Sequence, residues 1–142
     1  MFPFDSAVEE SLNTHHTKKS KEANYVFLDH FYLNTHFLDF LKTIKHKCHI
    51  FIFTSGKLHK ETTIQSYLDG IFDGVLETDL LSINKLDSYS YPIVAEKIGS
   101  SISEILFIDD QLLHIKAAEF AGMQAILFED TKQIIECIEK LI

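Results

Sequence analysis

The sequence has few cysteines, no long apolar run and a shortage of positive charge. Cys48 and Cys137 are the two cysteines, and their separation matches no metal-binding spacing. Both fall in apolar patterns, which indicates reduced, partly buried thiols and a reducing setting. No apolar run approaches the length of a membrane span, and the first residues lack the cationic and apolar regions of a signal peptide. We therefore expect a cytoplasmic protein without a membrane partner.

The charge balance argues against nucleic acid as a partner. Lysine and arginine total 13 against 21 aspartate and glutamate residues, so the formal net charge is −8. Binding to a phosphate backbone needs a cationic footprint, which this composition does not favour. The chain is 142 residues long and 46% hydrophobic. It is therefore long enough to bury the core of a single domain.

The first 23 residues differ from the rest of the chain. Ser11–Glu22 is polar and has no clean period. We expect residues 1–23 to form a flexible arm or one marginal helix. The domain itself is expected at residues 24–142, where the pattern becomes regular.

From Asn24 onward, short apolar runs alternate with amphipathic helical patterns. The expected strands are Tyr25–Leu28, His49–Phe53, Ile71–Leu76, Ile105–Ile108 and Gln124–Phe128. The expected helices are Thr35–Lys47, Leu58–Leu68, Ser88–Ile98, Leu112–Ala121 and a closing helix through Ile134 and Leu141. Strands that alternate with helices predict an α/β fold, a doubly wound and mostly parallel sheet with right-handed crossovers.

Polar side chains follow several of these strands. Asp29 follows the first strand, and Asp109 and Asp110 follow the fourth. Open α/β sheets bind ligands beyond the carboxyl ends of their strands. Adjacent carboxylates repel each other unless a cation offsets the charge, and hard oxygen ligands suit Mg²⁺. A metal site is the favoured interpretation, and an acidic loop after a core strand is the alternative.

Two further features are ambiguous when taken alone. Thr54, Ser55 and Gly56 lie between the second strand and a helix, where hydroxyls and backbone N–H groups cradle a phosphate or simply cap the helix. Lys85 lies in a loop before a helix, where a lysine is normally solvated. Beside a phosphate and several carboxylates, the same lysine would neutralise charge and hold the anion.

The order of these parts resembles the haloacid dehalogenase-like (HAD-like) hydrolase superfamily. A strand ending in Thr-Ser precedes a lysine before a helix, and then a strand ending in Phe-Ile-Asp-Asp. Ile105–Phe128 is especially similar to the family's fourth motif and the helix and strand after it. The resemblance implies a Rossmann-like three-layer sandwich with about five strands in the order 3-2-1-4-5. In most members it also implies phosphoryl transfer through an aspartyl-phosphate and Mg²⁺.

The resemblance also implies roles for individual residues. Thr54 would hydrogen-bond the transferring phosphoryl group, with Ser55 beside it. Lys85 would be the third-motif lysine, although the familiar Lys-Pro-Asp-Pro reads Lys-Leu-Asp-Ser here. Asp109 would ligate Mg²⁺ directly, and Asp110 would do so directly or through water.

The first motif departs from the family's pattern. The family has Asp-x-Asp-x-Thr after its first strand, whereas this chain has Asp29-His30-Phe31-Tyr32-Leu33. Asp29 stands in the position of the nucleophile and metal ligand, but Phe31 replaces the acid that protonates the leaving group. His30 has a suitable pKa for that role. Adjacent strand-end residues point to opposite faces, however, which places His30 away from the site.

Two functions remain open on the sequence alone. One is a Mg²⁺-dependent phosphatase that acts on a phosphorylated small molecule or a phosphoprotein. The other is a catalytically silent binding or regulatory module. A receiver-like phospho-acceptor would carry its paired acids after the first strand rather than the fourth.

The segments after Asp29 and before Ser88 are too short for the caps that usually cover the site in this family. We therefore expect an open site. Association into a homo-oligomer is one way to close it.

Overall fold

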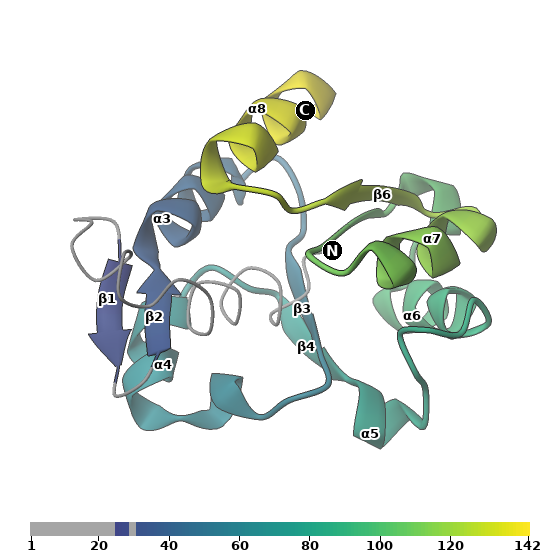
Figure 1. Ribbon diagram of the computed structural model, residues 1–142, viewed down its shortest axis with the longest axis horizontal. Helices are drawn as coiled ribbons and strands as arrows, with labels where there is room; N and C mark the ends of the chain where they lie inside the picture. The colour runs from purple at the N-terminus through teal and green to yellow at the C-terminus, as the bar shows by residue number, and fades with distance from the viewer. Residues whose placement is uncertain (1–24, 29–30) are drawn as a thin grey trace.

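The structure is a computed structural model that describes residues 25–28 and 31–142. The arm predicted for residues 1–23 lies outside the described residues, and so do Asp29 and His30. In the described part, strands and helices alternate along the chain as the sequence predicts (Figure 1).

Two pairs of parallel strands form the centre of the fold. Strand β3 (Phe51–Thr54) pairs with β4 (Gly74–Glu77), and β5 (Leu106–Asp109) pairs with β6 (Gln124–Leu127). Each pair is joined by a crossover that contains a helix, because parallel neighbours cannot be linked by a tight turn. These pairs correspond to the second and third, and to the fourth and fifth, of the predicted strands.

All the helices except α5 (Thr78–Leu81), which was not predicted, match the predicted segments closely. They are α3 (Thr35–Ile44), α4 (Thr62–Leu68), α6 (Ser90–Ile98), α7 (Leu112–Phe120) and α8 (Thr131–Leu141), with 3₁₀ turns η2 (Leu58–Lys60) and η3 (Ile102–Glu104). The predicted helix Leu58–Leu68 is divided, because Glu61 between η2 and α4 has an extended backbone. Pro92 falls in the first turn of α6, where its missing N–H costs no hydrogen bond, and Gly99 ends that helix with a φ of 82°.

Successive residues of the central strands face two separate hydrophobic cores. Ile52 and Ile108 pack into one core with α3, α4 and α8, whereas Phe53 and Phe107 pack into the other with α6 and α7. This alternation is the geometry of a strand buried on both faces. Figure 1 shows α3 and α8 on one side of the strands and α6 and α7 on the other. The result is a three-layer α/β/α arrangement, as predicted.

Polar contacts fix the two helices that cover the first core. The Asn34 side chain accepts a hydrogen bond from the Phe37 N–H at 3.0 Å and so caps α3. The same side chain donates to the Thr131 hydroxyl at 2.7 Å, at the start of α8. The helices α3 and α8 are therefore tied together at their N-terminal ends, although 97 residues separate Asn34 from Thr131.

The predicted strand order 3-2-1-4-5 is not confirmed. The described strands form three two-stranded sheets, and β1 (Tyr25–Leu28) pairs antiparallel with β2 (Phe31–Asn34). The sequence analysis treated Phe31–Asn34 as a connection and expected no strand there. Only two residues separate these apolar segments, which is the spacing of an antiparallel hairpin, whereas a parallel neighbour needs a longer crossover.

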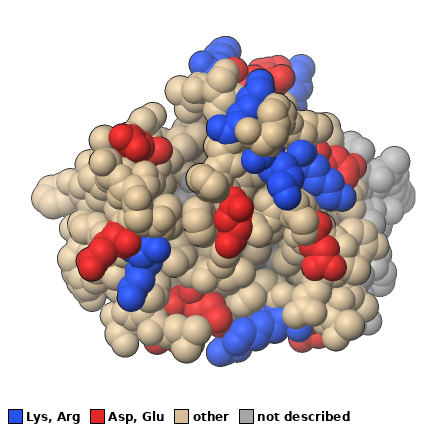
Figure 2. Space-filling view, turned by 180° about the vertical axis from the view of Figure 1, so that it is seen from behind, with Lys and Arg blue, Asp and Glu red and all other residues tan. Residues whose placement is uncertain are grey.

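The surface combines charges of both signs. On the face shown in Figure 2, Lys side chains lie among Asp and Glu side chains rather than in one large basic area. This distribution agrees with the net charge of −8. In the described part of the chain, no helix is both long and apolar enough to cross a membrane.

Candidate functional site

The candidate site is built around Asp109, the last residue of β5. Its side chain is 1% exposed, because the preceding residues of the strand are buried and the chain turns directly into α7. The Asp109 carbonyl accepts a hydrogen bond from the Phe128 N–H at 2.8 Å, and its Oδ1 accepts one from the Gln111 N–H at 2.8 Å. The carboxylate is therefore held at the carboxyl end of the strand, as predicted.

Lys85 reaches this carboxylate from the loop before α6. Its Nζ lies 3.5 Å from Asp109 Oδ2, and the lysine is 2% exposed. The ammonium also lies 5.1 Å from the centroid of the Phe53 ring, a cation–π distance. A buried ammonium is costly unless it is paired, so this contact sets the position of the side chain. The loop lysine is thus part of the site and not a solvated surface residue.

Tyr91 holds the backbone that carries Lys85. Its hydroxyl donates to the Lys85 carbonyl at 2.7 Å and lies 3.2 Å from the His114 carbonyl. The ring packs edge-on against Phe53 and Phe107 at centroid distances of 6.2 and 5.2 Å. Tyr91 therefore connects the lysine loop, the start of α7 and the two central strands.

His114 is a site residue that the sequence analysis missed. Its Nδ1 lies 3.1 Å from Asp109 Oδ2, on the same oxygen that contacts Lys85. His114 is the third residue of α7, which begins directly after the Asp109-Asp110-Gln111 segment. The available signal was this position, since the first turn of a helix that follows a strand end remains close to that strand end.

These contacts shift the ionisation of two buried groups. Burial opposes the charged form of Asp109, but the hydrogen bond with His114 and the charge of Lys85 outweigh burial and hold the pKa of Asp109 below its ordinary value. Burial raises the pKa of the Tyr91 hydroxyl, and the Asp109 charge adds to that effect. The site thus combines an ionised carboxylate with a phenol that stays neutral.

Thr54 ends β3 and begins the predicted phosphate cradle. Its side chain is fully buried, and its Oγ1 accepts a hydrogen bond from the Gly56 N–H at 2.9 Å. Ser55 and Gly56 are exposed, so the loop itself faces solvent. Thr54 follows Phe53, whose ring contacts the Lys85 ammonium, which places the loop beside the Lys85–Asp109 pair.

The predicted site residues have separate outcomes. The structure places Lys85 in direct contact with Asp109, and Thr54, Ser55 and Gly56 at the adjacent strand end. Asp110 follows Asp109 and is half-buried, and Asp29 lies outside the described residues. The chemical roles assigned to these side chains remain predictions.

The adjacent carboxylates of Asp109 and Asp110 suit a hard cation. Within residues 25–28 and 31–142, no group of three or more His, Cys, Asp or Glu side chains is arranged to hold a metal ion. Mg²⁺ does not need such a cage, because proteins commonly bind it through one or two carboxylates, with waters and substrate phosphate completing the octahedron. The donor set of the described residues therefore fits Mg²⁺.

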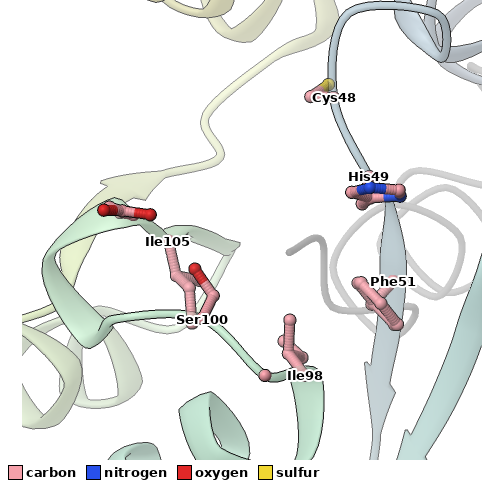
Figure 3. Close-up of a pocket in the computed structure, with 8 residues that line it drawn as sticks. Cys48, His49, Phe51, Ile98, Ser100 and Ile105 are labelled. Carbon is pink, nitrogen blue, oxygen red and sulfur yellow. The ribbon is translucent and has the colours of Figure 1, made fainter.

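A cavity of about 440 Å³ lies at the opposite edge of the strands (Figure 3). Cys48, His49 and Phe51 line one side of it, and Ile98 and Ile105 lie on the other. These residues belong to the amino ends of β3 and β5 or precede them. The cavity is therefore separate from the site that contains Thr54, Lys85 and Asp109.

Comparison with known proteins finds enolase-phosphatases among the curated relatives. No family model matches the chain. Enolase-phosphatase E1 from Shewanella frigidimarina is 34% identical over 116 residues, which cover 75% of this chain and 50% of that protein. The chain spans about half the length of the curated relatives it matches.

Solved structures share the fold at lower identity. A Porphyromonas gingivalis protein, described as a predicted HAD-like family hydrolase, has a TM-score of 0.66 and 18% identity, covering 79% of this chain and 60% of its own. A Bacteroides thetaiotaomicron HAD family enzyme, solved in complex with magnesium and inorganic phosphate, has a TM-score of 0.59 and 17% identity, covering 74% and 60%.

The fold and the site together define the class of this protein. It is an α/β domain of Rossmann type, in which strand ends gather a hydroxyl loop, a buried lysine and a pair of carboxylates. Together with this geometry, the enolase-phosphatase relatives and the fold neighbours support the haloacid dehalogenase-like superfamily for this chain.

Proposed function

We propose that the chain is a phosphatase-type hydrolase that cleaves phosphomonoesters with Mg²⁺ as cofactor. The observation that carries this proposal is the buried contact of Lys85 with Asp109 beside the Thr54 loop. The enolase-phosphatase relatives and the neighbour solved with magnesium and phosphate support the same reaction class. A phosphorylated small molecule is the substrate that these relatives favour.

The proposed reaction has two displacement steps. An Asp29 carboxylate oxygen attacks phosphorus, the ester P–O bond breaks, and an aspartyl-phosphate forms while the leaving oxygen takes up a proton. Water then attacks the phosphorus of that intermediate, which releases inorganic phosphate and restores the carboxylate. Asp29 holds this role because it follows the first predicted strand and has the place of the family's nucleophile.

The described residues would stabilise the charge on the transferring group. Lys85 places an ammonium in a water-poor position, where it counters negative charge more effectively than in solvent. The exposed residues Ser55 and Gly56 border the Thr54 hydroxyl, on the side of the loop from which a phosphate would approach. Bound through Asp109 and Asp110, Mg²⁺ would supply further charge neutralisation at the phosphate oxygens.

The connections around the site are short in the described part of the chain, which supports the expectation of a site without an inserted cap. Only β2 lies between β1 and α3, and only α5 and a short loop lie between β4 and α6, so neither connection holds an inserted cap. An open site admits a bulky substrate such as a phosphoprotein. It could instead be covered by a second copy of the chain in a homo-oligomer.

The first experiment is a phosphatase assay of the whole chain with p-nitrophenyl phosphate, with Mg²⁺ and then with a chelator. We expect Mg²⁺-dependent release of p-nitrophenol that Asp29→Asn abolishes. The matched control is Asp39→Asn, which alters an exposed aspartate on α3 and should leave the rate unchanged. Full activity of Asp29→Asn would contradict the nucleophile assignment.

A catalytically silent module is the second candidate, and Phe31 favours it. Phe31 stands where the family carries a proton-donating acid, and loss of such a group lowers rates by roughly 10²–10⁴-fold. A silent module would bind Mg²⁺ with trifluoroberyllate, which mimics the aspartyl-phosphate, or bind vanadate, without turnover. Binding of these probes together with no hydrolysis of any ester would favour this candidate over the phosphatase.

A further inference from the structure

A second cluster of charges lies at the same edge of the fold. Three basic nitrogens surround one oxygen, Glu77 Oε1: Lys60 Nζ at 3.4 Å, His59 Nε2 at 3.8 Å and Lys57 Nζ at 3.9 Å. The Glu77 side chain is 11% exposed, whereas those of Lys57 and Lys60 are 63% and 52% exposed. The carboxylate is therefore enclosed, and the two ammonium groups extend into solvent.

The cluster adjoins the predicted phosphate cradle. Glu77 ends β4 and is the direct neighbour of Thr54 across the parallel pair β3–β4. Neighbouring strands lie about 5 Å apart, so the carboxylate starts one strand away from the Thr54 hydroxyl. Lys57 follows Gly56 directly, and Lys60 ends the turn η2 that begins one residue later. The basic side chains thus border the loop that faces the substrate.

The cluster carries more positive than negative charge. Among the described residues, the ion pairs of this cluster set two lysines against one carboxylate, so the cluster has a positive balance whatever the state of His59. Each ammonium has three donors, and contact with one carboxylate oxygen leaves donors directed to solvent. The ammonium ends are exposed and screened by solvent, so their contacts with the enclosed carboxylate add less to stability than a fully buried pair would. The two lysines can therefore turn to a second anion at low cost.

We propose that Lys57 and Lys60 bind a second anionic group of the substrate, so that the preferred substrate is a phosphomonoester that also carries a carboxylate or another phosphate. This inference rests on the proposed phosphatase function and narrows its substrate class. The phosphate would occupy the Thr54–Gly56 loop beside Lys85. The second anion would lie on the β4 side of that loop, where Glu77 positions the two lysines.

The test compares two esters that differ in one group. Glycerol 3-phosphate and 3-phosphoglycerate have the same carbon skeleton, but only the second carries a carboxylate. We expect wild type to have the higher kcat/KM for 3-phosphoglycerate. In the double variant Lys57→Gln/Lys60→Gln, the ratio of the two kcat/KM values should fall about fivefold, the size expected for exposed charge pairs. An unchanged ratio would overturn the proposal.

Two more variants separate the subsite from a general effect of charge. Lys97→Gln removes an exposed charge from α6, next to Ile98 and Gly99 of the cavity at the opposite edge, and should leave the ratio unchanged. Glu77→Gln removes the competing carboxylate and should raise the ratio. A ratio that falls equally in Lys97→Gln and in the double variant would contradict a local subsite, as would a fall in Glu77→Gln.

Calorimetry distinguishes failure of this inference from failure of the proposed function. If wild type hydrolyses neither ester, the phosphatase proposal fails, and binding of 3-phosphoglycerate and of inorganic phosphate is measured directly. The subsite predicts that Lys57→Gln/Lys60→Gln weakens binding of 3-phosphoglycerate more than binding of phosphate. Equal weakening of both ligands, or no weakening of either, would overturn it.

Discussion

Two charge clusters stand at one edge of this fold, and they differ mainly in their exposure to water. Lys85 and Asp109 form a pair in which both residues are almost fully buried, with His114 on the same carboxylate. Glu77 has basic neighbours at similar distances, but two of them are exposed lysines. A buried ion pair is costly to break by removing one partner, whereas an exposed pair is screened and contributes little. The first cluster therefore fixes the geometry of the site, and the second is free to adapt to a ligand.

The largest effect is expected from breaking the buried pair at its carboxylate. Asp109→Asn removes the carboxylate that contacts the buried Lys85 ammonium, and loss of one partner of a buried pair typically costs about 3–5 kcal/mol of unfolding free energy. Urea denaturation of both proteins at pH 7 measures the difference. The control is Asp39→Asn, whose exposed pairing with Lys42 should contribute well under about 1 kcal/mol. Equal stability of the two variants would show that burial does not distinguish the clusters.

The same pair predicts how stability depends on pH. Because the pKa of Asp109 is lowered in the folded protein, its ionised form contributes stability above the ordinary carboxyl pKa of about 4. That contribution is lost as the pH falls through the lowered folded value. The stability difference between wild type and Asp109→Asn should therefore shrink as the pH falls below about pH 4. Denaturation curves across this range check the sign.

Removal of the lysine should cost less stability than removal of the carboxylate. Lys85→Met keeps the apolar stem near Phe53, and Asp109 retains its hydrogen bond from the Gln111 N–H and its contact with His114. We expect a loss of about 2 kcal/mol, within the range for a hydrogen bond to a charged group, together with weaker phosphate or vanadate binding. Vanadate titration of Lys85→Met and of the surface variant Lys97→Met separates weaker anion binding at the site from a general effect of removing a positive charge. Unaltered affinity in Lys85→Met would remove Lys85 from the predicted phosphate site.

The contrast between the clusters also shows what the sequence could predict. Asp109 was predictable because the apolar run Ile105–Ile108 ends abruptly in carboxylates, a pattern typical of a buried parallel strand. Lys85 was predictable only through the order of motifs, since an isolated loop lysine carries no local signal. His114 was missed because its position in the first turn of α7 places it near the strand end but does not specify which way its side chain points.

The strand order shows the limit of pattern reasoning in the backbone. The periodicity of Tyr25–Leu28 correctly indicated a strand, but periodicity does not specify which neighbour a strand selects. The strand pairs antiparallel with Phe31–Asn34, a segment that was predicted only as the connection between Asp29 and the helix at Thr35. The cluster around Glu77 was missed for a related reason, since it needs both the register of β3 with β4 and the turn η2.

A hydroxyl within the buried cluster offers a smaller test of the same comparison. Tyr91→Phe keeps the ring between Phe53 and Phe107 but removes the donor to the Lys85 carbonyl. The unpaired carbonyl should cost about 1 kcal/mol of unfolding free energy, because one buried hydrogen bond is lost. Tyr89→Phe is the matched control, since Tyr89 is 58% exposed. Equal denaturation midpoints for the two variants would show that the hydroxyl does not stabilise the lysine loop.

The smallest effect is expected in the exposed cluster. Glu77→Gln preserves the shape of the side chain and removes the charge that Lys57 and Lys60 share. Because those lysines are exposed, the unfolding free energy should change by less than in Asp109→Asn. A small change in the unfolding free energy is informative only together with a change in substrate preference. Side chains that add little to stability can bind a ligand without weakening the fold. The test is two measurements on Glu77→Gln. Denaturation gives its unfolding free energy, and kinetics give its ratio of kcat/KM for 3-phosphoglycerate over glycerol 3-phosphate. A loss of stability comparable to that of Asp109→Asn would mean that Glu77 is structural, and the contrast between an adaptable and a fixed cluster would fail.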